Sequence, residues 1–248
     1  MNYIVPIVSN IENIVNVTRL LRIEVIMSNM YEFVKTRNYI GGECIHQCSY
    51  CYVQTMKKRN SVIAQKYSGD PFLCDREFKK GLGKNNTWFI GSCIDMFAEN
   101  IPALFVHTIL NTLTNYNNTY FLQSKNPKRF LEFTFTKKTI LCTTVESNCI
   151  YDNISKAPNV IERLKYINVA SMEKELPIHI TIEPIMDFDL NEFVEMLRLA
   201  DPIQINIGAD SKGHKLPEPS SDKIKKLITE LEKFTTVYQK QNLKRLLI

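Results

Sequence analysis

Three cysteines lie close together in the stretch GGECIHQCSYCYV, which begins at Gly41. Their spacing is Cys44-x-x-x-Cys48-x-x-Cys51, with His46 between the first two. Thiolates are soft ligands that select zinc, copper(I) or iron–sulfur clusters over magnesium and calcium. A structural zinc site takes four ligands, so the fourth would be His46 or a distant cysteine or histidine. A four-iron cluster held by three cysteines would keep one iron open to another ligand.

The other four cysteines are not expected to form disulfides. The total of seven is odd, and the N-terminus lacks a secretory signal, so a disulfide framework is not expected. Cys93 and Cys142 lie in apolar runs that predict strands. We expect them, together with Cys74 and Cys149, to be small buried side chains.

The elements that must position the cysteine loop follow from an alternation of β-rich runs and amphipathic stretches. The predicted strands are 33–40, 87–93, 119–125, 139–147, 179–184 and 202–208. Helices are predicted over 52–58 and 158–174 and after residues 100, 126, 189 and 221, whereas 59–85 reads as a loop or hairpin insertion. Six βα units predict an α/β fold, a partial (β/α)6 TIM-like barrel of parallel strands with outer helices. A doubly wound sheet is the alternative.

Length and composition set the remaining limits. The 248 residues, 44% of them hydrophobic, suffice for one large core. We expect a single domain over 31–248, preceded by an extension over 1–30 with no assigned role. The formal net charge of +5 permits an anionic partner without requiring one. No apolar run is long enough to span a membrane, so a cytoplasmic protein without a membrane partner is expected.

The cysteine spacing, with Tyr50 before the last cysteine, resembles the signature of the radical S-adenosylmethionine (SAM) superfamily. Further segments resemble successive strand ends of one phage- and bacterium-borne family in it, whose activity is unassigned and which is related to spore photoproduct lyase. These segments are FIGSCIDMFAENIP, FLQSKNPKRF, TTVES, ITIEPIMDFDL and INIGADSKG. Two motifs depart from that family by an extra residue, at Met96 and at Asn126. The resemblance covers residues 35–215.

The resemblance implies an iron–sulfur cofactor and a radical reaction. Cys44, Cys48 and Cys51 would hold a [4Fe-4S] cluster whose open iron binds SAM. Reductive cleavage of SAM would give a 5′-deoxyadenosyl radical that abstracts hydrogen from the substrate. The electron would come from an external donor such as flavodoxin or ferredoxin. Kinship with a DNA-lesion lyase makes nucleic acid or a nucleotide the expected substrate class.

Polar residues at the predicted strand ends are the candidate ligand contacts, because barrel enzymes build their sites there. Glycine allows close backbone approach, a serine hydroxyl can bond a ligand, and a lysine can neutralise a carboxylate. With the resemblance, the residues expected to contact SAM are Tyr50, Gly91, Ser92, Lys125, Thr144, Glu146 and Glu183. For Glu146, an ion pair with Arg163 or Lys125 is the alternative. Asp95 is expected to pair with substrate or with Lys125.

Two of the remaining cysteines have a second interpretation. The related lyase relies on a cysteine that donates hydrogen, and Cys93 and Cys149 are the candidates for that role. Two other functions remain open: a zinc- or cluster-binding module that recognises nucleic acid without catalysis, and a barrel that has lost its chemistry and acts as an interaction protein.

Overall fold

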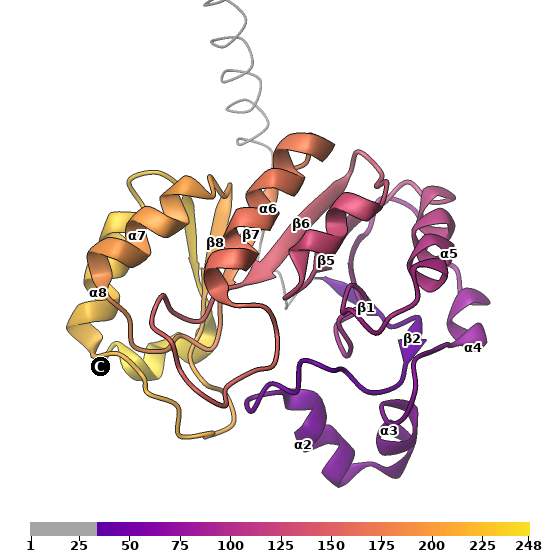
Figure 1. Ribbon diagram of the computed structural model, residues 1–248, viewed down its shortest axis with the longest axis horizontal. Coiled ribbons are helices and arrows are strands. Elements are labelled where there is room, and N and C mark those ends of the chain that lie inside the picture. Colours follow the sequence, from indigo (N-terminus) through magenta and orange to yellow (C-terminus); the bar gives the residue numbers. More distant parts are fainter. Residues whose placement is uncertain (1–33) are drawn as a thin grey trace, which may run out of the picture. The chain divides into compact units, whose positions relative to one another are not determined.

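The computed structural model describes residues 34–248, so the predicted extension over 1–30 lies outside it. Residues Val34–Ile248 form one compact unit. Its main sheet has seven parallel strands in the order β1-β4-β5-β6-β7-β8-β9 (Figure 1). The strands are β1 (Lys35–Arg37), β4 (Thr87–Ile90), β5 (Thr119–Gln123), β6 (Thr139–Thr144), β7 (Ile178–Ile182), β8 (Gln204–Ile207) and β9 (Thr236–Gln239).

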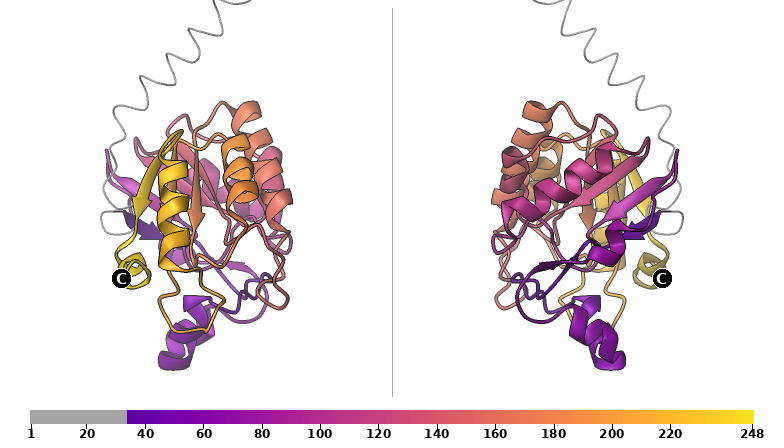
Figure 2. Two further views of the ribbon diagram at one scale, coloured as in Figure 1. Left: turned by 90° about the vertical axis from the view of Figure 1, so that its left-hand side faces the viewer. Right: turned by 90° about the vertical axis from the view of Figure 1, so that its right-hand side faces the viewer.

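Helices cover one face of this sheet, as Figures 1 and 2 show. They are α5 (Ala103–Thr114), α6 (Val160–Lys174), α7 (Leu190–Leu199) and α8 (Ser221–Leu231). A 3-10 segment, η1 (Pro127–Glu132), connects β5 to β6, and another, η2 (Gln241–Leu246), follows β9. The predicted α/β class, with parallel strands and outer helices, is confirmed.

Strand alternation divides the side chains of the sheet between two faces. On β7, Ile178, Ile180 and Ile182 belong to the apolar core that also contains Leu164 and Ile167 of α6. The residues between them point to the opposite face. We call that opposite face, which α5, α6, α7 and α8 leave uncovered, the inner face of the sheet.

Helix starts follow local sequence signals in some cases and not in others. Asp189 accepts a hydrogen bond from the backbone N–H of Glu192, so α7 begins directly after this capping residue, as expected for a helix after residue 189. The helix expected after residue 126 is only the short 3-10 segment η1, and the side chain of the preceding Asn126 makes no capping bond.

Three predictions about the fold need correction. The stretch 33–40 does not form one strand: only β1 joins the sheet, while β2 (Ile40–Gly41) pairs antiparallel with β3 (Phe72–Leu73). Around that pair, the chain forms α2 (Tyr52–Arg59), α3 (Ser61–Lys66) and α4 (Asp75–Phe78), where a loop or hairpin was expected for most of 59–85. A seventh parallel strand, β9, was missed, although three of the four residues in TVYQ are of strand-forming types.

No helix in residues 34–248 has both the length and the apolar character needed to cross a bilayer.

Candidate active site

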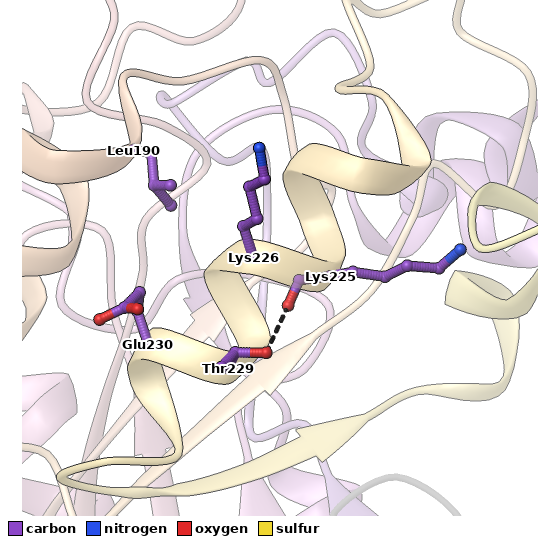
Figure 3. A pocket seen from close by; sticks show the side chains of 5 residues that line it. All are labelled: Leu190, Lys225, Lys226, Thr229 and Glu230. Carbon is purple, nitrogen blue, oxygen red and sulfur yellow. Dashed lines mark hydrogen bonds between the residues drawn. The ribbon is translucent and has the colours of Figure 1, made fainter.

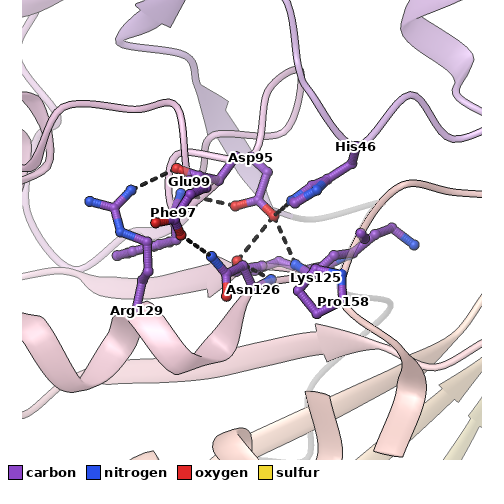
Figure 4. Close-up of polar contacts among 12 residues, drawn as sticks. His46, Asp95, Phe97, Glu99, Lys125, Asn126, Arg129 and Pro158 are labelled. Carbon is purple, nitrogen blue, oxygen red and sulfur yellow. Dashed lines mark hydrogen bonds and ion pairs between the residues drawn. The ribbon is translucent and has the colours of Figure 1, made fainter. Parts of the chain in front are cut away.

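The cysteine loop is fixed to the carboxyl ends of the strands by a buried carboxylate. Asp95, which follows β4, accepts hydrogen bonds at Oδ2 from His46 Nε2 (2.9 Å), Ser124 Oγ (3.0 Å) and the backbone N–H of Lys125 (2.8 Å) (Figure 4). Its Oδ1 accepts from the backbone N–H of Phe97 (2.9 Å). One carboxylate therefore joins the cysteine loop to the ends of β4 and β5.

The surroundings keep Asp95 ionised. Burial acts to raise its pKa, but the hydrogen bond and charge of His46 and the backbone N–H groups hold the pKa below its usual range. The predicted partner Lys125 contributes its backbone N–H here, and its ammonium points elsewhere. His46, 3% exposed, serves as an anchor of the loop.

The three cysteines of the loop are free thiols of intermediate exposure. The backbone N–H of Cys51 donates to the carbonyl of Cys48 (3.0 Å), and Cys48 Sγ lies 3.2 Å from Ser155 Oγ, in the segment after β6. Gly42 and Gln47 adopt positive φ, which lets the loop turn back on itself.

The donor set of the loop fits an iron–sulfur cluster. Three thiolates in one loop, with no fourth cysteine in it, match a four-iron cluster that keeps one iron open to another ligand. Burial raises the pKa of Cys44 to about 11 and also raises that of Cys51, and a charge on Cys48 would add to both. These thiols lie near one another, so ionising all three at neutral pH requires a compensating positive charge, which iron supplies.

A buried ion-pair cluster lies beside the loop. Glu146, just beyond β6, receives Lys125 Nζ at Oε1 (2.5 Å) and Arg163 Nη1 at Oε2 (2.8 Å). Tyr50, which immediately precedes Cys51, donates its hydroxyl proton to Glu146, and its ring centre lies 4.9 Å from Lys125 Nζ. The predicted ion pair of Glu146 therefore exists with both cations.

The charges of this cluster are strongly coupled. Burial alone would raise the pKa of Glu146, but the charges of Lys125 and Arg163 lower it to about 2. Thr144, two residues earlier on the same face, accepts a hydrogen bond from Gln123 Nε2 (2.8 Å). The structure thus brings together four of the predicted contacts, Tyr50, Lys125, Thr144 and Glu146, next to the third cysteine.

Gly91 and Ser92 form a second group at the end of β4. Gly91 has φ +79°, a conformation that disfavours other residues, and its N–H donates to the carbonyl of Arg37 (2.9 Å). Ser92 Oγ lies 3.1 Å from the side-chain nitrogen of Asn38. Tyr52, the residue after Cys51, donates to the carbonyl of Ser92 (2.7 Å), which ties this group to the cysteine loop.

The burial predicted for the remaining cysteines holds only in part. Cys142 is fully buried. Cys93 lies beyond the end of β4, is half-buried, and places its sulfur 3.5 Å from the hydroxyl of Tyr52. Cys149 is exposed and Cys74 is half-buried. The apolar run around Cys93 extends past the last strand residue, which explains the incorrect prediction.

The side chain of Glu183 has no recorded contact with the Glu146 cluster. Its carboxylate pairs with Lys240 and accepts from Asn242 Nδ2 (2.8 Å), both near the C-terminus. Asp210, after β8, lies 2.6 Å from His214 Nδ1. Among the described contacts of both carboxylates, none reaches Lys125 or Glu146.

Some residues of the site had no signal in the sequence. Asn38 accepts from the backbone N–H of Cys93 (2.9 Å), and Ser155 bonds Cys48 and the carbonyl of His46. Both lie in irregular segments without a motif, so only the folded chain shows their role.

A surface hollow of about 300 Å³ lies at α7 and α8 (Figure 3). It is lined by Leu190, Lys225, Lys226, Thr229 and Glu230. None of these residues contacts the cysteine loop or the Glu146 cluster in the described structure, so the hollow is separate from the candidate site.

Comparison with known proteins gives a structural match without a sequence match. No protein-family model and no curated protein matches the chain. A mutant of spore photoproduct lyase with bound AdoMet and dinucleoside spore photoproduct superposes with a TM-score of 0.60 at 10% identity, over 82% of this chain and 75% of that one. This chain has the fold of spore photoproduct lyase.

Two more structures support the same fold. The lyase complexed with dinucleoside spore photoproduct gives a TM-score of 0.57 at 11% identity, over 81% of this chain and 74% of that one. Methylornithine synthase gives 0.51 at 13% identity, over 94% and 72%. The fold that the sequence resemblance implied, a partial barrel related to that of the lyase, is confirmed.

Proposed function

We propose that this protein is a radical SAM enzyme. The observation that supports it best is the position of the cysteine loop: the His46–Asp95 contact holds it at the carboxyl ends of the strands, beside the buried Glu146 cluster. In barrel folds these ends form the active site. A mononuclear structural metal would not need polar residues from several strands around it.

Different residues of the chain bind the cluster and SAM in this proposal. Cys44, Cys48 and Cys51 hold a [4Fe-4S] cluster, which when bound supplies the electron for cleavage of SAM into methionine and a 5′-deoxyadenosyl radical. Lys125 offers an ammonium to the SAM carboxylate, and Glu146 keeps that ammonium in place.

The remaining predicted contacts complete the pocket for SAM. Gly91 and Ser92 offer close backbone approach and a hydroxyl. Tyr50, inside the cysteine loop, contacts Lys125, and Thr144 lies two residues before Glu146 on β6. Glu183, which pairs with Lys240 and accepts a hydrogen bond from Asn242, is the last of the proposed contacts.

Cys93 is the better candidate for the hydrogen donor. It is half-buried and contacts Tyr52, next to the cysteine loop, whereas Cys149 is exposed. Its S–H bond breaks homolytically, and the hydrogen atom passes to the substrate carbon radical. The thiyl radical left on Cys93 takes an electron from the external donor, flavodoxin or ferredoxin, and a proton from water.

The proposed substrate class is nucleic acid or a nucleotide. Two solved structures with this fold contain a dinucleoside photoproduct, and the formal charge of +5 suits an anionic substrate.

Anaerobic reconstitution with iron and sulfide tests the proposal. The reconstituted full-length chain is reduced in the presence of SAM, and bound iron and released 5′-deoxyadenosine are measured. About four irons per chain and nucleoside release are expected. Replacing Cys44, Cys48 or Cys51 with alanine should abolish both, while the exposed Cys149→Ala serves as the matched control with unchanged iron. A colourless protein with one zinc and no nucleoside release would contradict the proposal and favour the recognition module.

A further inference from the structure

The segment that connects β6 to α6 lies against the cysteine loop. The backbone N–H of Ser49 donates to the carbonyl of Ile154 (2.8 Å), and that of Lys156 donates to the carbonyl of His46 (2.7 Å). Ser155 lies between the two residues of its own segment that make these bonds. Its side chain is therefore held at the loop, although it is 109 positions away from His46 along the chain.

The hydroxyl of Ser155 contacts one of the three cysteines that are proposed to hold the cluster. Its Oγ lies 3.2 Å from Cys48 Sγ and 3.2 Å from the carbonyl oxygen of His46. The same oxygen accepts a hydrogen bond from the backbone N–H of Ala157 (3.1 Å), which fixes its position. A hydroxyl has one proton, so Ser155 donates either to the sulfur or to the carbonyl.

The charge on the sulfur decides between these two acceptors. The carbonyl of His46 already accepts the shorter hydrogen bond from Lys156. A cysteine that binds iron is a thiolate, which has no proton of its own to donate. Hydrogen bonds to ionised acceptors are shorter and stronger than bonds to neutral ones. With Cys48 bound to iron, the proton of Ser155 is therefore directed at the sulfur.

Backbone donors stabilise the other two sulfurs of the loop. Cys44 and Cys51 each have two backbone N–H groups that favour the thiolate against the effect of burial. These N–H groups belong to Asp95, His46, Val53 and Gln54. A backbone donor remains after almost any substitution. At Cys48, by contrast, the donor is a side chain that a single substitution removes.

We infer that Ser155 is a positioning residue that raises the reduction potential of the cluster by donating a hydrogen bond to the sulfur of Cys48. The inference rests on the proposed function, because it requires the cluster. Hydrogen bonds to the sulfurs help to set the potential of an iron–sulfur cluster. Reduction adds negative charge, so a donor at a coordinating sulfur stabilises the reduced form more than the oxidised form. Ser155 therefore makes the cluster easier for the external donor to reduce.

A redox titration of the reconstituted full-length chain, followed by electron paramagnetic resonance, tests the inference. Ser155→Ala removes the hydroxyl and leaves both backbone bonds of its segment in place. At the midpoint potential of the wild type, we expect the ratio of reduced to oxidised cluster to fall about tenfold in this variant. That change corresponds to a shift of about 59 mV toward more negative potential for a one-electron couple.

Two further variants show whether the hydroxyl itself causes the shift. Ser155→Thr keeps a hydroxyl at the same position and should restore the potential of the wild type. Ser49→Ala removes an exposed serine of the same loop and should leave the potential unchanged. A wild-type potential in Ser155→Ala, or an equal shift in Ser49→Ala, would overturn the inference.

Iron content separates an effect on potential from a loss of structure. All of these variants should bind as much iron per chain as the wild type, because each keeps the three cysteines. Loss of iron in Ser155→Ala would overturn the inference as well. Ser155 would then be needed to retain the cluster and not to set its potential.

The titration is carried out without SAM, so it does not depend on SAM cleavage. Release of 5′-deoxyadenosine from the reconstituted wild type tests the proposed function alone. A cluster with the expected shift but without nucleoside release would support the inference and contradict the proposed enzyme. Nucleoside release with equal potentials in wild type and Ser155→Ala would support the enzyme and overturn the inference.

Discussion

His46 Nε2 lies 2.9 Å from Asp95 Oδ2, and through this contact the loop that carries the three cysteines is fixed to the end of β4. The two residues are 49 positions apart, and both are buried or nearly so. Asp95 also binds the start of the segment after β5, so one carboxylate determines where the cysteines lie relative to the strand ends.

Replacing this carboxylate should loosen the loop. Asp95→Asn keeps the size of the side chain but removes the charge that His46 and the backbone N–H groups stabilise. We expect the free energy of unfolding to fall by about 2 kcal/mol. Alkylation of Cys44, Cys48 and Cys51 in iron-free protein should also become faster. Urea unfolding and mass spectrometry measure the two effects. The exposed Asp222→Asn is the control, and equal behaviour of both variants would refute the anchoring role.

The buried ion-pair cluster should contribute far more to stability than a surface pair. Glu146→Gln leaves Lys125 and Arg163 without their counter-charge, so we expect a loss of about 3–5 kcal/mol in urea unfolding. Glu195 pairs with Arg198 at 3.3 Å on the surface of α7, and its side chain is 64% exposed. Glu195→Gln should therefore cost less than about 1 kcal/mol. Similar losses in both variants would show that the cluster is no stronger than a surface pair.

The cysteines should differ in reactivity in an order set by burial. Alkylating reagents attack the exposed thiolate, so the exposed Cys149 should react first in native protein. Cys142 is fully buried and burial raises its pKa, so it should react only after unfolding. Cys93 should fall between them. Iodoacetamide labelling followed by peptide mass spectrometry gives the order. Early labelling of Cys142 would contradict its place in the sheet.

The buried His179 should make stability depend on pH. Its pKa falls from 6.5 to about 3 on folding, so below pH 6.5 the unfolded chain binds a proton that the folded chain does not. The contribution of this residue is therefore fully present above pH 6.5 and is lost as pH falls toward 3. Between pH 7 and pH 5 the loss should be about 2 kcal/mol.

Urea unfolding of the wild type and of His179→Phe at pH 7, 6 and 5 measures this pH-dependent contribution to stability, because the variant has no imidazole at that position. The two free-energy curves should converge or cross as pH falls, and His107→Gln should run parallel to the wild type. Parallel curves for His179→Phe would mean that the ring is not held neutral.

Local patterns predicted a large part of the fold. The βα alternation indicated six of the seven parallel strands and the helices after them, because each element carries its own periodicity and end signals. The pairing of β2 with β3 gave no such signal, and β9 was missed although most of its residues are of strand-forming types. Those elements are short, and neighbouring segments stabilise them more than their own residues do.

The sequence by itself determined the donor set, because Cys44, Cys48 and Cys51 are close along the chain and any fold keeps them close. It also indicated that Lys125, Thr144 and Glu146 belong to strand ends. Only the tertiary structure decided which of these groups meet.

The contact of His46 with Asp95 and the complete burial of His179 depend on strands brought together from distant parts of the chain. No local pattern encodes such a contact, because its free energy arises from burial and charge that exist only after the sheet has formed.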